Sequence, residues 1–249
     1  MMTGLIVIPA RFEASRFSGK LLSDLHGKPV IQHVYERAKL CKNTRVLIAT
    51  DDERIRKVSQ SFGAVVKMTS STHQSGTERI IEAIKGEKED LIINVQADEP
   101  LIHPGDLDDL ILMMKDNPSV LIGTLAVPIA NKKDYENPHI VKVIMDEADV
   151  AVSFSRKPIP EDAWNDYKSE FVKPVWKHVG VYAYRREVLE KWNTMPITKL
   201  EEEEKLEQLR ALSYGIEIKI LKISRDTIGI DTPEDLDLVR EFIAKKQRR

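Results

Sequence analysis

Several features that mark particular protein classes are scarce in this sequence. Its 249 residues include one cysteine, Cys41, which excludes an internal disulfide and a four-cysteine metal site. Lys and Arg number 38 against 40 Asp and Glu, so there is no basic excess for sequence-independent binding of nucleic acid. No apolar run is long enough to span a bilayer, and residues 1–10 lack the charged start of a signal peptide. The composition therefore predicts a soluble, cytoplasmic protein.

What the sequence does contain is a regular alternation of strand and helix patterns. Short apolar runs at 5–10, 45–50, 64–68, 90–93 and 120–129 are typical of buried strands. Helical patterns at 29–40, 51–62 and 104–115 fall between them, with a further helix beginning in 73–79. This alternation predicts an α/β fold with a mostly parallel central sheet.

The second half of the chain has a different rhythm. Residues 141–146 and 150–155 flank an acidic turn and predict an antiparallel hairpin, and 157–174 reads as a long loop. A strand at 178–184, a helix to Trp192, one long helix at 201–214 and a strand at 216–223 are expected after it. We therefore predict a single domain over 1–249, with a hairpin and loop excursion at about 141–184.

The stretch 94–100, Asn-Val-Gln-Ala-Asp-Glu-Pro, follows one of the buried strands. Asp98 is therefore expected at the carboxyl end of a strand, where open α/β sheets gather their ligands. A carboxylate in this position is a natural ligand for Mg²⁺, which uses one or two carboxylates together with substrate phosphates. Capping of the helix that begins near Pro104 is the alternative interpretation.

The loop 11–20 follows the first strand and carries three cations, Arg11, Arg16 and Lys20. It matches neither the P-loop nor the dinucleotide-binding glycine pattern. Arginine forks and a mobile lysine could nonetheless bind a triphosphate. A solvated surface loop is the alternative.

Three further segments carry polar residues at helix starts. Asp51 and Asp52 fit the pattern of helix N-terminal acids. Residues 73–79 place small hydroxyl residues and a glycine where backbone N–H groups could meet a ligand, although plain capping explains them as well. Asp231 follows the apolar residues 228–230 and precedes Thr232 and Pro233, an N-cap with proline at the first helical position.

Taken together, these segments resemble the 3-deoxy-D-manno-octulosonate (Kdo) cytidylyltransferase family, the CMP-Kdo synthetases of lipopolysaccharide synthesis. The resemblance extends over nearly the whole chain. The resemblance lies in a series of short segments, which are, in chain order, 8–11, 19–20, 27–29, 49–51, 73–79, 94–100, 154–156, 177–182, 206–209 and 231–235. Each segment alone is weak, and their order and spacing are specific.

The resemblance implies a Rossmann-like nucleotidyltransferase sheet with a smaller antiparallel part that helps form a homodimer. It also implies a reaction that joins CTP to the anomeric hydroxyl of Kdo and releases pyrophosphate with Mg²⁺ as cofactor. Asp98 and Asp231, on separate strand ends, would bind Mg²⁺ and act in catalysis with Lys20. The implied nucleotide-binding residues are Ala10, Arg11, Arg16, Lys20, Ser75, Gly76, Arg79 and Gln96. The implied sugar-acid residues are Arg156, His178, Tyr182, Glu207 and Gln208.

The chain departs from the family pattern at Ala97, Ala14 and Ser18, where glycine, serine and proline are usual. Ala97 adds a methyl group near the nucleotide, and Ser18 leaves the loop backbone less restricted than proline would. These departures leave open a Kdo variant such as 8-amino-Kdo. Sialic acid is another sugar acid to consider, but segments 154–156 and 177–182 favour the Kdo branch. A catalytically silent, CTP-binding regulatory protein is the alternative of another class, against which Lys20, Asp98 and Asp231 argue.

Overall fold

The computed structural model describes residues 4–13, 16–129, 131–159 and 175–247. The chain divides into two compact units, a first unit of residues 1–109 with 227–249 and a second unit of residues 110–226. The expectation of a single domain stays a prediction. No helix in the described ranges is long and apolar enough to cross a membrane.

The first unit contains a parallel sheet in the order β6-β1-β4-β5. The strands span β1 (Gly4–Ala10), β4 (Thr44–Thr50), β5 (Val65–Met68) and β6 (Leu91–Val95). Every residue of β1 and β6 is buried, which accounts for their continuously apolar sequences. Because all four strands are parallel, the residues that follow β1 and β6 emerge at the same edge of the sheet.

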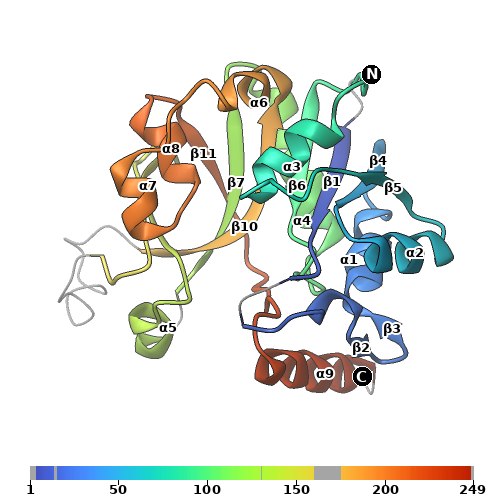
Figure 1. Cartoon of the computed structure of the whole chain (residues 1–249). Coiled ribbons are helices and arrows are strands. Elements are labelled where there is room, and N and C mark those ends of the chain that lie inside the picture. The colour runs from blue at the N-terminus through green and yellow to red at the C-terminus, as the bar shows by residue number, and fades with distance from the viewer. Residues whose placement is uncertain (1–3, 14–15, 130, 160–174, 248–249) are drawn as a thin grey trace. The chain divides into compact units, whose positions relative to one another are not determined.

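Helices and short elements complete this unit. They are η1 (Lys20–Leu22), β2 (Asp24–Leu25), β3 (Lys28–Pro29), α1 (Val30–Ala38), α2 (Glu53–Ser61), α3 (Gly76–Ala83), the start of α4 (Pro104–Asp116) and α9 (Pro233–Gln247). Figure 1 shows α9 running beside the β2–β3 hairpin, where Leu236 and Val239 join a core with Leu25 and Val30. The C-terminal helix thereby becomes part of the unit formed by the first 109 residues.

The second unit is built on antiparallel pairs with one parallel pair. Its strands are β7 (Ile122–Pro128), β8 (Lys142–Met145), β9 (Ala151–Ser155), β10 (Trp176–Arg185) and β11 (Ile218–Lys222). β10 pairs antiparallel with β7 and β8, β8 forms the expected hairpin with β9, and β11 runs parallel to β7. The helices are α5 (Lys132–Glu136), α6 (Arg186–Trp192), α7 (Lys199–Glu204) and α8 (Gln208–Ser213). The prediction of a mixed α/β fold with a parallel sheet and a smaller antiparallel part is confirmed.

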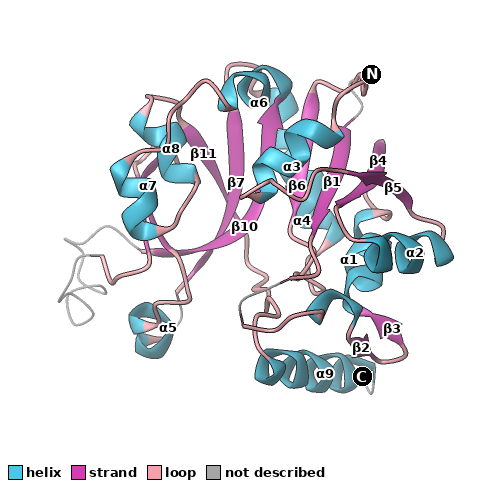
Figure 2. Ribbon diagram, viewed as in Figure 1, coloured by secondary structure: helices cyan, strands magenta, loops and turns pink. Residues whose placement is uncertain are grey.

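The prediction of one long helix over 201–214 is wrong. Figure 2 shows α7 and α8 as separate helices, and Lys205 between them has a left-handed backbone with φ 54°. Arg210 donates two hydrogen bonds, of 2.8 and 2.6 Å, to the carboxylate of Glu201. Residues nine positions apart lie about 13.5 Å apart along a continuous helix, so this buried ion pair requires the chain to turn back.

Two smaller expectations also change. Asp52 caps α2 as predicted, accepting from the N–H groups of Arg54 and Ile55, but Asp51 instead accepts a 3.0 Å bond from Arg79. Residues 228–230 form no strand, so Asp231 does not follow a strand end. This segment is placed by a 2.9 Å hydrogen bond from the Ile230 N–H to the Asp98 carbonyl. Much of the loop expected at 157–174, and the departure at Ala14, lie outside the described residues.

Candidate active site

The loop after β1 is shaped around Gly19 and Phe12. Gly19 has φ 73°, and a Cβ on it would come within 3.0 Å of the Phe12 ring. The Gly19 N–H also donates to the Phe12 carbonyl at 2.9 Å, which closes the loop. Glycine is therefore required on both conformational and steric grounds. Lys20 follows this closed loop as the first residue of η1.

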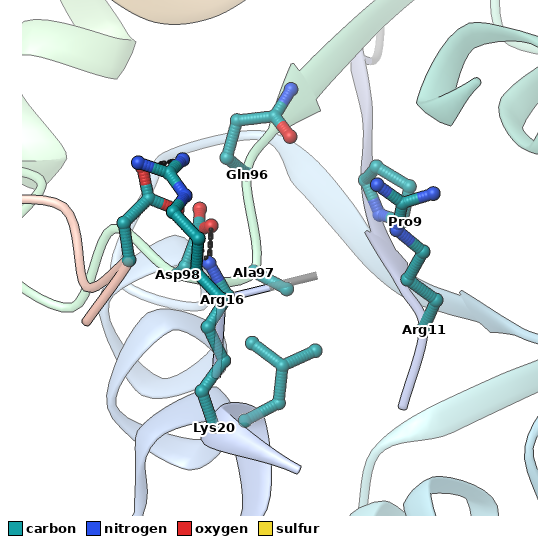
Figure 3. Close-up of a pocket in the computed structure, with 9 residues that line it drawn as sticks. Pro9, Arg11, Arg16, Lys20, Gln96, Ala97 and Asp98 are labelled. Atoms are coloured by element: carbon teal, nitrogen blue, oxygen red, sulfur yellow. Dashed lines mark hydrogen bonds and ion pairs between the residues drawn. The ribbon is translucent and has the colours of Figure 1, made fainter. Parts of the chain in front are cut away.

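Lys20 connects the two carboxylates that the sequence singled out. Its ammonium donates to Asp98 at 2.6 Å and to Asp231 at 2.9 Å, and Arg16 donates to the other oxygen of Asp231 at 2.7 Å. These residues come from the loop after β1, the turn after β6 and the segment before α9. Figure 3 shows Arg16, Lys20 and Asp98 gathered on one side of the pocket. The structure therefore brings together all three residues predicted to act in catalysis.

The backbone around Asp231 is fixed independently of this ion cluster. The N–H groups of Asp231 and Thr232 both donate to the Asp235 carboxylate, at 3.0 and 2.9 Å. The Asp235 N–H returns a 3.2 Å bond to the Thr232 hydroxyl, which completes the capping box at the start of α9. Asp231 is thus positioned by a helix start that the sequence predicted.

The ion cluster shifts the proton affinities of its members. Burial by itself lowers the pKa of Lys20, but the carboxylates of Asp98 and Asp231 outweigh it and the pKa is raised. Burial alone would raise the pKa of Asp231, whereas Lys20 and Arg16 lower it below its usual range. Lys20 is therefore a stable cation, and Asp231 a stable anion, across the physiological pH range.

A pocket opens over this cluster. Its lining residues are Pro9, Arg11, Arg16, Lys20, Leu21, Gln96, Ala97, Asp98 and Asp231. Figure 3 shows Arg11 beside Pro9, on the opposite side of the pocket from Lys20 and Arg16, so cations flank the space from two sides. Such an arrangement suits a ligand with several negative charges.

A second pocket adjoins the first through Pro9, Arg11 and Gln96, which line both. It is also lined by Ala10, His73, Gln74, Ser75, Gly76 and Arg79. Ser75 is the N-cap of α3, its hydroxyl accepting from the Glu78 N–H at 3.2 Å. All eight residues predicted to bind nucleotide therefore lie on one pair of adjoining pockets in the first unit.

Arg79 lines the second pocket and is also held by side chains from two other segments. Its side chain is 4% exposed, and it donates to the Thr69 hydroxyl at 2.5 Å and to the Asp51 carboxylate at 3.0 Å. The guanidinium thus ties α3 to the residues that follow β4 and β5. No local pattern links Asp51, Thr69 and Arg79, so sequence reasoning missed this network.

The residues predicted to contact a sugar acid all belong to the second unit. On β10, the His178 and Tyr182 rings lie 5.2 Å apart, and Tyr182 stacks on Tyr184 at 5.6 Å. Tyr184 meets the Trp192 ring at 6.1 Å, and the Trp192 indole N–H donates to Glu207 at 3.2 Å. A continuous run of contacts therefore joins His178 to Glu207, with the buried Gln208 next in the chain.

His178 is a neutral side chain in this setting. Burial lowers its pKa to about 3, and burial also raises the pKa of Tyr182 well above its usual value. The Thr124 hydroxyl donates to the Val181 carbonyl at 2.6 Å and lies 3.0 Å from His178 Nε2, so it accepts from that nitrogen. A neutral, hydrogen-bonded imidazole fits a ligand contact better than a general base.

Arg156 follows β9 and is held against the end of α7. Its backbone N–H donates to the Glu204 carboxylate at 3.0 Å, and its Nε donates to the Glu204 carbonyl at 3.1 Å. The guanidinium also lies 3.5 Å from the Pro138 carbonyl. Glu204 and Pro138 were not singled out from the sequence, since nothing local connects them with Arg156.

The donor chemistry around Lys20 can be compared with the needs of a divalent cation. Within the described ranges, no cluster of three or more His, Cys, Asp or Glu residues could hold a metal. Two carboxylates nevertheless converge on one ammonium, in a pocket lined by cations that suit phosphate. Mg²⁺ commonly takes one or two protein carboxylates and completes its shell with phosphates and water. The residues present fit that ion.

Comparisons with known proteins agree with one another. A family model described as cytidylyltransferase matches residues 5–220. A 3-deoxy-manno-octulosonate cytidylyltransferase of Geobacter sulfurreducens is 46% identical, covering 94% of this chain and 97% of that protein. The enzyme of the same name from Thermodesulfovibrio yellowstonii is 45% identical, covering 97% and 98%.

Solved structures of similar fold agree with the sequence comparisons. CMP:2-keto-3-deoxy-manno-octonic acid synthetase, complexed with CTP, is similar with a TM-score of 0.91 and 41% identity, covering 98% of this chain and 99% of that one. A putative glucose-1-phosphate thymidylyltransferase from Bacillus anthracis has a TM-score of 0.68 at 15% identity, covering 97% and 95%. The second likeness concerns the fold alone.

Replacing Lys20 tests the electrostatic coupling in the cluster. Lys20→Met removes the ammonium that lowers the pKa of Asp231, so we expect that pKa to rise in a titration followed by carboxyl-carbon NMR. The depressed pKa stabilises the fold above pH about 4, the usual value for an aspartate, and this contribution disappears as the pH falls through the folded-state pKa. The acid side of the stability profile should therefore flatten in the variant.

Lys28→Met is the matched control, because Lys28 pairs with Glu36 at 2.7 Å and does not touch the cluster. The pKa of Asp231 should be unchanged in it. An unchanged Asp231 pKa in Lys20→Met would contradict the coupling.

Proposed function

The chain belongs to the 3-deoxy-manno-octulosonate cytidylyltransferase family, and from this we propose that it transfers the cytidylyl group of CTP to the anomeric hydroxyl of Kdo. The products are CMP-Kdo and pyrophosphate. The observation that carries the proposal is the ammonium of Lys20 bound to Asp98 and Asp231 in a pocket flanked by Arg11 and Arg16. A nucleotidyl transfer needs this concentration of positive and negative groups, because its charges are borne by phosphate oxygens.

The triphosphate of CTP is assigned to the cationic loop. Arg11, Arg16 and Lys20 line one pocket, and guanidinium and ammonium groups bind phosphate oxygens strongly. When the α-phosphorus is attacked, negative charge develops on the departing pyrophosphate, and these cations stabilise it. Bound CTP would offer Lys20 and Arg16 phosphate oxygens in place of the aspartates they contact now.

The cytidine part is assigned to the adjoining pocket. Ala10, Ser75, Gly76 and Gln96 line it with small side chains, backbone groups and one amide. Gly76 lies against Pro9, where an added Cβ would meet the proline ring at 3.4 Å. Arg79 contributes to this pocket mainly by fixing α3, because its guanidinium is committed to Thr69 and Asp51.

Asp98 and Asp231 would hold Mg²⁺ when the nucleotide is bound. The ion would neutralise phosphate charge and lower the pKa of the attacking hydroxyl. Both carboxylates face the ammonium of Lys20, and Lys20 and Arg16 lower the pKa of Asp231, which favours the anionic form that a magnesium ligand needs. No covalent nucleophile from the protein is needed for this reaction, which agrees with the absence of a Ser-His-Asp pattern among the proposed residues.

The sugar acid is assigned to the second unit. Arg156 offers a guanidinium, the group that pairs best with a carboxylate such as that of Kdo. Neutral His178, Tyr182, Glu207 and Gln208 would supply hydrogen bonds to hydroxyl groups.

Ala97, the departure from the family pattern in the first unit, lines the nucleotide pocket and not this cluster. Ser18 donates to Glu13 at 3.2 Å, on the loop that precedes Lys20.

Pyrophosphate release tests the reaction and the substrate together. We expect release from CTP in the presence of Mg²⁺ and Kdo, and little release with UTP, ATP or sialic acid. A preference for 8-amino-Kdo would keep the reaction and change the sugar. CTP binding without pyrophosphate release from any of these sugar acids would contradict the proposal and favour a regulatory CTP-binding protein.

Asp98→Asn tests the proposed metal ligand. We expect the variant to fold normally and to lose roughly a hundredfold or more in turnover, because a neutral amide cannot replace the charged ligand. Asp108→Asn is the control, since Asp108 accepts a hydrogen bond from the Lys42 N–H and lines neither pocket. Near-normal turnover in Asp98→Asn would rule out this metal assignment.

We also propose that the chain acts as a cytoplasmic homodimer in lipopolysaccharide synthesis, on the strength of the family to which it belongs. Light scattering at working concentration should give twice the mass of the 28.4 kDa chain. A monomeric mass at that concentration would reject the dimer and leave the proposed reaction intact.

A further inference from the structure

Lys142 is a fully buried lysine that the proposed chemistry does not use. It lies at the start of β8, its exposed fraction is 0%, and lysine is among the residues least often buried in this way. Its ammonium donates to three carbonyl oxygens, those of Asn137 at 2.6 Å, Ile140 at 2.9 Å and Arg156 at 2.8 Å. An ammonium has three N–H donors, so these carbonyls satisfy all of them.

The third carbonyl gives Lys142 a connection to the sugar-acid cluster. Lys142 holds the Arg156 carbonyl while Glu204 holds the Arg156 N–H, so the backbone of Arg156 is fixed on both sides. The other two carbonyls belong to the segment 137–140, and the Pro138 carbonyl within it accepts from the Arg156 guanidinium. One buried cation thus orders both the backbone of Arg156 and part of the surroundings of its side chain.

We propose that Lys142 is a positioning residue for the sugar acid, fixing the direction of the Arg156 guanidinium without touching the substrate. This inference rests on the proposed function, because it assumes that Arg156 binds the carboxylate of the sugar acid. A buried charge needs full hydrogen bonding to be tolerated, so its geometry is tightly defined. The hydrogen bond from Lys142 to the Arg156 carbonyl fixes the Arg156 backbone, from which the side chain extends. A guanidinium that is already in position binds a carboxylate with less loss of entropy.

The charges around Lys142 add a pH dependence. Burial lowers its pKa to about 8, Arg156 acts in the same direction, and Glu204 opposes them. Lys177 is opposite Lys142 in the β8–β10 register, and its ammonium is paired with Asp226 at 2.8 Å. Above pH about 8 the amine keeps two N–H donors for three carbonyls, so one of these bonds is lost and the anchor on Arg156 weakens.

Lys142→Met is the first test, since it keeps the apolar stem and removes the donors. We expect the KM for the sugar acid to rise about tenfold or more, as loss of a charged hydrogen bond implies, while the KM for CTP stays within about twofold. Lys219→Met is the matched control. Lys219 also lies on a strand of the second unit and donates to a backbone carbonyl, that of Ala148, but it does not contact Arg156. Both KM values should be unchanged in it.

A double-mutant cycle separates positioning from a general structural role. In an Arg156→Ala background, Lys142→Met should raise the KM for the sugar acid no further, because its effect passes through Arg156. An equal increase in both backgrounds overturns the proposal. A normal KM for the sugar acid in Arg156→Ala overturns it as well, but pyrophosphate release from CTP and Kdo by the unmodified protein would then still support the proposed function.

The unmodified protein provides a measurement that does not depend on the folding of a variant. Between pH 7 and pH 9.5, the KM for the sugar acid should rise through pH about 8 relative to the KM for CTP. A constant ratio of the two KM values over this range overturns the pH dependence, and the Lys142→Met and Arg156→Ala variants then decide the positioning role.

Discussion

Two carboxylates that lie close together repel each other, and a cation between them offsets this repulsion. In this protein the cation is the ammonium of Lys20. It lies between Asp98 and Asp231, and Arg16 adds a second cation at Asp231. The cluster joins three segments that are far apart in the sequence. It also keeps Asp231 ionised and Lys20 charged, which are the states in which they can hold a metal ion and phosphate. The fold of the first unit brings these segments together.

The parallel sheet does this by its geometry. β1 and β6 are neighbours and run in the same direction, so the cationic loop after one and the Asp98 turn after the other start at the same edge. Gly19 lets the loop turn back over Phe12, which places Lys20 at the pocket. The hydrogen bond from the Ile230 N–H to the Asp98 carbonyl holds the segment before α9 next to the Asp98 turn. The C-terminal helix therefore contributes to the arrangement of this pocket, because its capping box fixes the backbone of Asp231.

The second unit uses buried charge in a related way. The Glu201–Arg210 pair accompanies the turn between α7 and α8, in which Glu207 lies and after which Gln208 begins α8. Glu204 accepts from the backbone N–H of Arg156, and Lys142 donates to its backbone carbonyl. Glu201 accepts two hydrogen bonds from Arg210, and the three donors of the Lys142 ammonium are all engaged. Such groups are costly to bury and specific in geometry, which makes them suited to fixing the position of a neighbouring side chain.

The sequence by itself determined the features that depend on local interactions. Apolar runs predicted the strands β1, β4, β6 and β7, and the cap residues Asp52 and Thr232 predicted the starts of α2 and α9, because capping and burial patterns involve neighbouring residues. Only the tertiary structure decided the contacts between distant residues. Lys20 and Asp231 are 211 positions apart, Arg79 donates to Asp51, and Lys205 breaks an expected helix so that Glu201 can meet Arg210. Ion pairs of this kind follow from how the chain packs, and no periodicity or spacing along the sequence encodes them.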